Sequence, residues 1–193
     1  MTASTAMRDG ETMMAVSGGQ RWRTSWHPAG GRPDGRNHGA AGVCVGNDGR
    51  DLVLISSDQE HWAFPAGRPE GDETLRETLD REMREEACVD VVEARLLGFA
   101  RSECVQGHEN GLVLVRSIWF AVVTIRTWEP QFEIDHRKIV PVADAWQEVN
   151  DQNSVVARVS MRALAEAGLG GARAEAQRSM IGPAAGLHRP DRQ

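Results

Sequence analysis

Short apolar runs separated by turn signals fill the first half of the central region and predict strands. Runs at 40–45 and 52–55 flank the Asn-Asp-Gly turn at 47–49, a pattern typical of a β-hairpin. The segment 62–65 alternates large and small apolar residues and breaks at its proline, so it predicts a brief strand that leads into a glycine turn at Gly67.

The second half of the central region carries the longest apolar runs. Those at 91–100 and 112–125 predict two strands joined by a Gly-rich loop at 107–111. The second run is nearly continuous, so we expect that strand to be buried. The run 139–142 predicts a last short strand, with Pro141 near a sheet edge.

Two segments have helical periodicity. Thr74 and Glu77 have the spacing of a capping box, so the first helix is expected from about 75 to 87. A second helix fits 154–167, where apolar residues recur on one stripe. Strands precede, flank and follow the first helix, which indicates a mixed α/β (α+β) fold with a sheet between helices. The apolar arc of the first helix contains Leu75, Leu79, Met83 and Ala87.

We expect four segments along the chain. Residues 1–37 are rich in Gly, Ser, Thr, Ala and Pro and predict an irregular arm. A single domain follows at 38–150, then a C-terminal helix at 151–168 and a flexible tail at 169–193. Trp22 and Trp26 are unusual in an irregular arm. They either pack on the domain or a partner chain, or stack on a base.

Bulk composition excludes several classes of protein. The net charge of −6 argues against a nucleic-acid partner. No apolar run reaches the roughly 20 residues that span a membrane, and the N-terminus lacks the apolar segment of a signal peptide. The three cysteines have no metal-ligand spacing, which favours a reduced, cytoplasmic chain.

The most informative stretch lies within the first helix, where Glu82, Glu85 and Glu86 occupy neighbouring positions on the helix surface. A solvated face with Glu/Arg pairs explains Glu77 and Arg81 well. It explains Glu82 and Glu86 poorly, because both lie beside the apolar arc. The like charges of Glu82, Glu85 and Glu86 repel one another, and a divalent cation bound between them would remove that repulsion. Ligands that are all oxygen favour Mg²⁺ or Mn²⁺, which share their coordination with substrate phosphates.

This stretch resembles the Nudix box, Gly-x5-Glu-x7-Arg-Glu-U-x-Glu-Glu-x-Gly-U, in which U is bulky and apolar. Eight of the nine fixed positions match at residues 67–89, and Cys88 stands where the pattern has Gly. The flanking sequence agrees, so the resemblance covers about residues 38–150. The matching residues are Gly67, Glu73, Arg81, Glu82, Met83, Glu85, Glu86 and Val89.

The resemblance implies an α/β/α sandwich around a mixed sheet and Mg²⁺-dependent hydrolysis of a phosphoanhydride bond in a nucleoside diphosphate linked to another group. By that resemblance, Glu82 and Glu86 would be direct metal ligands. Glu85 would be a ligand or the base that polarises water. Arg81 would orient the carboxylates, and the backbone carbonyl of Ala66 would join the metal shell.

The resemblance also implies supporting residues. Glu73 would be a further ligand or an anchor for the start of the helix, next to Gly67. A carboxylate from a late loop completes many such sites, and Glu133 is the candidate, ahead of Asp135 and Glu129. For Glu133, a solvated loop residue is an equally good interpretation.

Substrate signals are weak. Arg101, His108 and Glu109 could line a substrate pocket, although a solvated loop explains them as well. The substrate is expected to be a small nucleotide, and a homodimer is possible. Two alternatives use the same fold: a catalytically weak or inactive nucleotide-binding regulatory module, and a prenyl diphosphate isomerase. The complete set of box carboxylates argues against the first, and a missing cysteine motif argues against the second.

Overall fold

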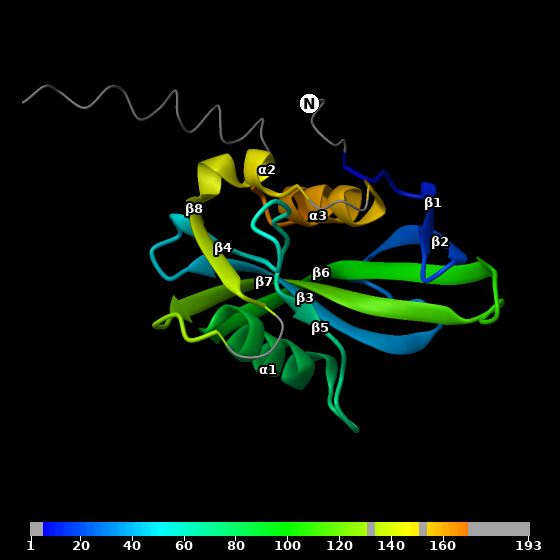
Figure 1. Cartoon of the computed structure of the whole chain (residues 1–193), viewed down its shortest axis with the longest axis horizontal. Coiled ribbons are helices and arrows are strands. Elements are labelled where there is room, and N and C mark those ends of the chain that lie inside the picture. The colour runs from blue at the N-terminus through cyan, green and yellow to red at the C-terminus, as the bar shows by residue number, and fades with distance from the viewer. Residues whose placement is uncertain (1–5, 131–133, 151–153, 170–193) are drawn as a thin grey trace, which may run out of the picture.

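A mixed β-sheet runs through the centre of the molecule, with helices on both of its faces (Figure 1). The computed structural model describes residues 6–130, 134–150 and 154–169. Within these residues the sheet has eight strands in the order β1-β2-β6-β7-β3-β4-β8, and β5 pairs with β3. The strands are β1 (Thr12–Ser17), β2 (Gln20–Pro28), β3 (Arg36–Gly46), β4 (Asp51–Ser56), β5 (Ala66–Gly67), β6 (Val89–Gln106), β7 (Val113–Ile125) and β8 (His136–Pro141).

The helices form the outer layers. They are α1 (Leu75–Ala87), the short η1 (Val142–Asp144) and α2 (Ala145–Glu148), and α3 (Ser154–Glu166). Helix α1 lies against one face of the sheet, and α2 and α3 lie against the other (Figure 1). This arrangement confirms the expected sandwich. No helix in the described part of the chain is long and apolar enough to cross a membrane.

Strand pairing explains why the sheet is mixed. β3 and β7 run parallel, and the other paired strands run antiparallel. The expected hairpin is confirmed, since β3 pairs with β4 across the turn. The strand predicted at 62–65 is wrong. Ala63 makes only an isolated bridge to Ile55, and the strand in this region is β5.

Each face of the sheet has its own hydrophobic cluster. On the α1 side, Leu79, Met83 and Ala87 are fully buried, which confirms the apolar arc of the helix. On the α3 side, Ala163 and Leu164 are fully buried in a separate cluster. Helix α1 therefore docks through the face that its periodicity predicts. Helix α3 buries Val159 and Ala163 of its predicted stripe, whereas Val156 of that stripe is 40% exposed.

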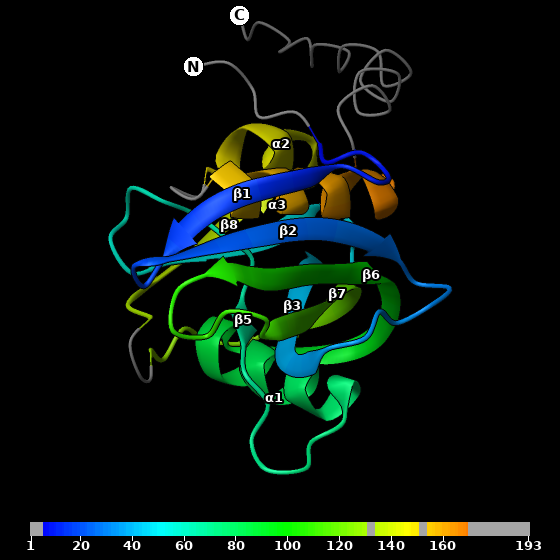
Figure 2. The same ribbon diagram turned by 90° about the vertical axis from the view of Figure 1, so that its right-hand side faces the viewer.

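The N-terminal arm is ordered where it was expected to be irregular. Residues 12–28 form the β1–β2 hairpin, which adds two strands beside β6 (Figure 2). Trp26 is 3% exposed and belongs to the α3-side cluster, so packing on the domain is the correct interpretation for this residue. Composition failed here because small polar residues are compatible with an edge hairpin once a neighbouring strand supplies hydrogen bonds. The division of the chain into four segments stays a prediction, and residues 170–193 lie outside the described part.

Helix α1 begins and ends as its sequence predicts. The Thr74 side chain accepts a hydrogen bond from the Glu77 backbone N–H, and the Glu77 carboxylate accepts one from Thr74 N–H at 2.8 Å. At the other end Cys88 adopts a left-handed conformation with φ of 51°. Because Cys88 has the backbone that the glycine of the family pattern would adopt, the departure from the pattern leaves the helix end unchanged.

We expect that Cys88→Gly keeps or raises the thermal stability. A side chain in left-handed conformation costs on the order of 1 kcal/mol, which glycine removes. The loss is a small buried thiol that, within the described residues, donates to the Glu129 carbonyl at 3.4 Å, and a thiol is a weak donor. Thermal melting of both proteins checks this, with Cys44→Gly, in the fully buried core and without left-handed strain, as the destabilised comparison. A clear fall in the melting temperature of Cys88→Gly would contradict it.

Candidate active site

Arg81 joins a carboxylate that precedes α1 to two carboxylates within the helix. Its guanidinium donates to both carboxylate oxygens of Glu73, from Nε at 2.8 Å and from Nη2 at 3.0 Å. Nη1 donates to Glu82 Oε1 at 3.0 Å and to Glu85 Oε2 at 2.9 Å. Nη2 also donates to the Arg68 carbonyl at 2.6 Å. One cation thus joins three carboxylates and fastens the preceding loop to the helix.

Charge and burial affect these carboxylates differently. Hydrogen bonds from Arg81 hold the pKa of Glu73 at about 2. Burial raises the pKa of Glu82, although Arg81 opposes the shift. Glu82 is only 7% exposed, so its charged form is incompletely compensated by the neighbouring groups. An additional cation beside Glu82 would remove that deficit.

Gly67 and Ala66 bring the strand β5 against the same carboxylates. A Cβ at Gly67 would lie 1.9 Å from Glu82 Cδ, so a side chain there would occupy the position of the carboxylate. Gly67 is therefore required for close approach, and the expectation of a glycine turn at this position is wrong, because it lies in β5. Ala66 N–H donates to Glu86 Oε2 at 2.7 Å. The structure thus brings together Ala66, Gly67 and Glu86 with Glu82.

The donor set suits a hard divalent cation in chemical type. Glu82, Glu85 and Glu86 supply carboxylate oxygens on one helix, and the backbone of Ala66 adjoins Glu86. No group of three acidic, His or Cys side chains within the described ranges has the geometry of a preformed metal site. One oxygen of Glu82 and one of Glu85 accept hydrogen bonds from Arg81, so these two oxygens are directed toward the guanidinium and away from a shared metal position. The residues therefore fit Mg²⁺ by type, and binding would require these oxygens to reorient.

A cavity of about 750 Å³ lies on the α3 side of the sheet, and none of the box carboxylates is among the described residues that line it. Two lining residues connect the cavity to the carboxylates. Ala66 N–H donates to Glu86, and the Arg68 carbonyl accepts from Arg81. Its walls come from the β1–β2 hairpin, the sheet and α3. The lining includes Ala15, Ser17, Gln20, Trp22, Thr24, Arg36, His38, Arg68, Ser102, Glu109, Leu112, Leu114, Arg116, Ile118, Val159 and Ala163.

Part of the lining of this cavity is basic although the chain as a whole is acidic. Arg36, His38, Arg68 and Arg116 all line it. Arg116 projects from β7, and its Nε is buried without a hydrogen-bond partner in the described part of the chain. Burial lowers the pKa of Arg116, and the charge of Glu86 acts in the opposite direction. An unsatisfied buried guanidinium N–H facing a cavity is suited to an anionic ligand.

Sequence reasoning missed Arg116, although a signal was present. The residue interrupts the apolar run 112–125, and a lone charge within a buried strand is costly unless it has a partner. Arg36, His38 and Arg68 gave no comparable signal, because they lie in polar, Gly-rich segments where a charged residue is ordinary. Only the pairing of β3 with β7 and β5 brings them beside Arg116.

His38 predicts a measurable dependence of stability on pH. Burial and the nearby charges of Arg116, Arg68 and Arg36 lower its pKa from 6.5 to about 4. Between these values the unfolded state binds more protons, so stability is complete above pH 6.5 and falls as pH drops toward 4. After allowance for solvent screening, we expect His38→Gln to remove about 1 kcal/mol of this dependence. Denaturant unfolding of both proteins from pH 7 to 4 measures it, and parallel curves would contradict it.

Several predicted residues lie away from this site. Arg101 pairs with Glu103 at 3.2 Å, and His108 is exposed in the β6–β7 loop. Neither is among the described residues that line the cavity. Glu109 does line it, which the sequence left open. Glu133 lies outside the described residues, so its role stays a prediction.

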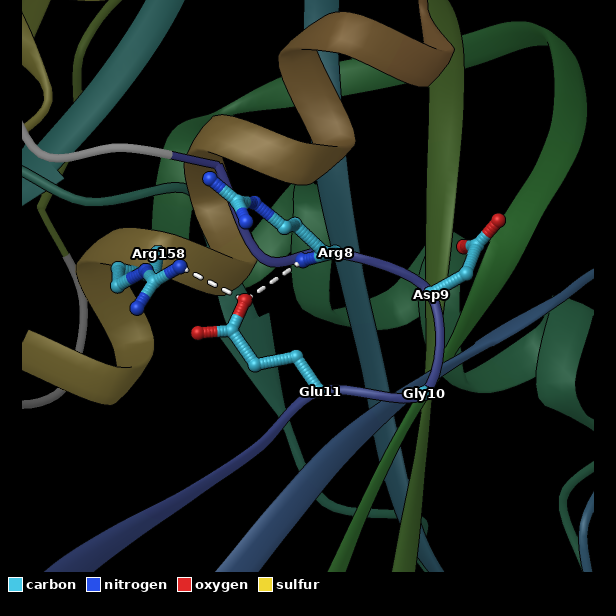
Figure 3. A pocket seen from close by; sticks show the side chains of 5 residues that line it. All are labelled: Arg8, Asp9, Gly10, Glu11 and Arg158. Carbon is cyan, nitrogen blue, oxygen red and sulfur yellow. Dashed lines mark hydrogen bonds and ion pairs between the residues drawn. The ribbon is translucent and has the colours of Figure 1, made fainter.

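A second, shallower hollow of about 740 Å³ lies between the residues before β1 and helix α3 (Figure 3). Glu11 Oε2 accepts hydrogen bonds from Arg8 N–H at 2.9 Å and from Arg158 Nη2 at 2.8 Å. The pKa of Glu11 is lowered mainly by the Arg8 N–H. The carboxylate is thus satisfied by the chain itself, and these contacts fasten the start of the hairpin to α3.

Comparison with known proteins agrees with this geometry. The domain model described as "NUDIX domain" matches residues 36–159. A 118-residue segment is 29% identical to an RNA pyrophosphohydrolase of Halorhodospira halophila, and the match spans 56% of this chain and 64% of that relative.

Two solved structures share the fold. A NUDIX hydrolase from Nitrosomonas europaea aligns with a TM-score of 0.52 at 16% identity, over 70% of this chain and 89% of that one. The NUDIX domain of NrtR from Shewanella oneidensis, solved with ADP ribose, aligns with a TM-score of 0.51 at 17% identity, over 71% and 90% of the two chains.

Proposed function

The chain belongs to the Nudix family, and from this premise we propose that it hydrolyses a phosphoanhydride bond in a nucleoside diphosphate linked to another group. One observation carries the proposal. The charges of the box carboxylates Glu86 and Glu82 act on Arg116, which lines a cavity together with Arg68. Acidic groups for a metal and basic groups for phosphate thus lie side by side, as hydrolysis of a polyphosphate requires.

In this proposal the box residues hold a divalent cation, Mg²⁺ or Mn²⁺. Glu82, Glu86 and the backbone carbonyl of Ala66 would be its ligands, and Glu85 would be a further ligand or would polarise the attacking water. When bound, the ion would neutralise phosphate charge and lower the pKa of water. Arg81 would keep the carboxylates in place through its ion pairs. Glu133 is the candidate for a completing carboxylate.

Arg116 and Arg68 would bind the phosphate oxygens. Arg116 is the better supported of the two, because its buried Nε has no hydrogen-bond partner among the described residues and Glu86 lies close enough to affect its pKa. A guanidinium can donate two parallel hydrogen bonds to a phosphate and stabilises the charge that develops on its oxygens. The water oxygen would attack phosphorus, and the bond from phosphorus to the bridging oxygen would break. Both products would leave as phosphate anions.

A panel of substrates tests the proposal. It contains ADP ribose and other nucleoside diphosphate derivatives, nucleoside triphosphates, and an RNA with a 5′ triphosphate, because the curated relative acts as an RNA pyrophosphohydrolase. Each is incubated with Mg²⁺ or Mn²⁺, and the phosphate products are identified. Cleavage between phosphorus and the bridging oxygen is expected for at least one class. No turnover of any member with either metal would contradict the proposal, and cleavage of RNA alone would contradict the expectation that no nucleic acid is bound.

A further inference from the structure

The β1–β2 hairpin forms a wall of the cavity that lies outside the matched family segment. The hairpin spans residues 12–28, before the match at 36–159. It lies along β6 at one edge of the sheet (Figure 2). Side chains from both of its strands face the cavity, so the hairpin contributes directly to the choice of ligand. They are Ala15, Ser17, Gln20, Trp22 and Thr24.

Trp22 differs from Trp26 in what it contacts. Trp26 is in the core, 3% exposed, with the Arg162 guanidinium 5.6 Å from its ring centroid. Trp22 is only partly buried and lines the cavity. The pairing of β2 with β6 shifts register between Arg21 and Trp22. Such an irregularity re-aims the side chain that follows it, and it is common beside functional sites.

The surroundings of Trp22 suit a flat, partly apolar group with polar edges. Leu112 and Leu114 line the same cavity, so apolar surface lies near the indole. Gln20 and Glu109 also line the cavity, and hydrogen bonds between them fix both side chains. Gln20 Nε2 donates to Glu109 Oε2 at 2.7 Å, and Glu109 N–H donates to Gln20 Oε1 at 2.9 Å. These two bonds hold the β6–β7 loop against the hairpin.

Strand register gives the separation between Trp22 and Arg116. Trp22 pairs with Cys104 of β6, and Arg116 pairs with Ala100 of the same strand. These two rows lie four residues apart, about 13 Å along the strands, and β2 is two strand spacings, about 10 Å, from β7. The Cα atoms are therefore roughly 16 Å apart. Because both long side chains face one cavity, the remaining gap fits a ligand with an aromatic group at one end and phosphates at the other.

We propose that Trp22 is a specificity-determining residue that stacks on the nucleobase of the substrate, with the substrate phosphates directed toward Arg116. The inference rests on the proposed function and assigns the nucleoside end of the ligand to the hairpin. It gives a role to a segment that the family match does not include. Stacking on an aromatic face tolerates different bases, so Trp22 selects for a base, and the polar groups nearby discriminate among bases.

The test compares ligands that differ only in the base. Calorimetric binding of AMP, GMP, CMP and UMP is measured against ribose 5-phosphate, without metal and without turnover. We expect at least one nucleotide to bind more tightly than ribose 5-phosphate. Trp22→Ala should weaken that nucleotide by about 5- to 150-fold and leave ribose 5-phosphate unchanged, and Trp22→Phe should retain most of the affinity. Trp128→Ala is the control, because Trp128 stacks on Arg137 at 5.1 Å and is not a cavity residue.

Failure of this inference can be separated from failure of the proposed function. Base-dependent binding that requires Trp22 in a protein that cleaves no substrate would support the inference and contradict the hydrolase. If the protein hydrolyses a substrate and Trp22→Ala still prefers nucleotides to ribose 5-phosphate, the hydrolase is supported and the inference about Trp22 is contradicted. If Trp22→Ala fails to fold, fluorescence replaces the binding comparison between that variant and the wild type. Nucleotide should then quench tryptophan fluorescence in the wild type, and this quenching should be lost in Trp22→Phe. Equal binding of nucleotide and ribose 5-phosphate by the wild type, or no nucleotide binding, overturns the inference.

Discussion

Glu86→Gln is expected to abolish hydrolysis while the fold survives. The substitution removes one negative charge and keeps the size of the side chain. The amide oxygen can still accept the 2.7 Å hydrogen bond from Ala66 N–H, so β5 stays attached to α1. A proposed metal ligand is lost, and the loss should exceed the roughly 10- to 100-fold typical of groups that only support a ligand. We expect kcat to fall by more than about 100-fold, measured on whichever substrate of the panel is cleaved.

Asp80→Asn is the matched control for Glu86→Gln. Asp80 lies on the same helix, about a third exposed, and pairs with Arg76 on the outer surface. The same change from acid to amide there should leave turnover within about twofold, because a surface ion pair contributes little. Melting temperatures of both variants should lie close to that of the wild type. Unchanged turnover in Glu86→Gln would contradict the proposed role of the box carboxylates.

Arg81→Ala is expected to lower both stability and turnover. The substitution removes five hydrogen bonds and leaves Glu73, Glu82 and Glu85 without their shared cation. Breaking a fully buried ion pair costs about 3–5 kcal/mol, and Arg81 is 18% exposed, so we expect a loss of about 2 kcal/mol in the free energy of unfolding. Arg81→Lys should fail to restore turnover, because a single ammonium cannot match the bidentate geometry with Glu73.

Denaturant unfolding measures the loss for Arg81, with Arg76→Ala as the control. Arg76 is also an arginine of α1 paired with a carboxylate, yet it is 41% exposed, and within the described residues its ion pair is with Asp80 alone. Its removal should cost less than about 0.5 kcal/mol. Equal losses for the two variants would show that Arg81 acts as an ordinary surface residue and does not organise the site.

The helix α1 shows how far local sequence can be interpreted. Its start, its end and its buried arc follow from Thr74, Glu77 and the spacing of apolar residues, because caps and amphipathic faces depend on residues a few positions apart. Cys88 stands where the family pattern has Gly, and its backbone is left-handed, a conformation that glycine adopts readily. Local interactions of this kind can be predicted from the sequence without knowledge of the tertiary structure.

The irregular arm was mispredicted for the opposite reason. β1 and β2 obtain their hydrogen bonds from each other and from β6, about 75 residues further along the chain. Composition describes only what a segment does by itself, and an edge strand forms when a distant strand offers it an open partner. The role of Gly67 was misread similarly, because the need for glycine comes from Glu82 across the packed helix.

The sequence by itself determined the family, the fold class and the carboxylate cluster, since the box residues lie within 23 positions and one helix fixes their spacing. Only the tertiary structure decided which residues join that cluster. Arg116, His38 and Trp22 come from β7, β3 and β2, and the strand order brings them to one cavity. The physical reason is that helix geometry is set by neighbours in sequence, whereas a cavity is set by the register of strands that are distant in sequence.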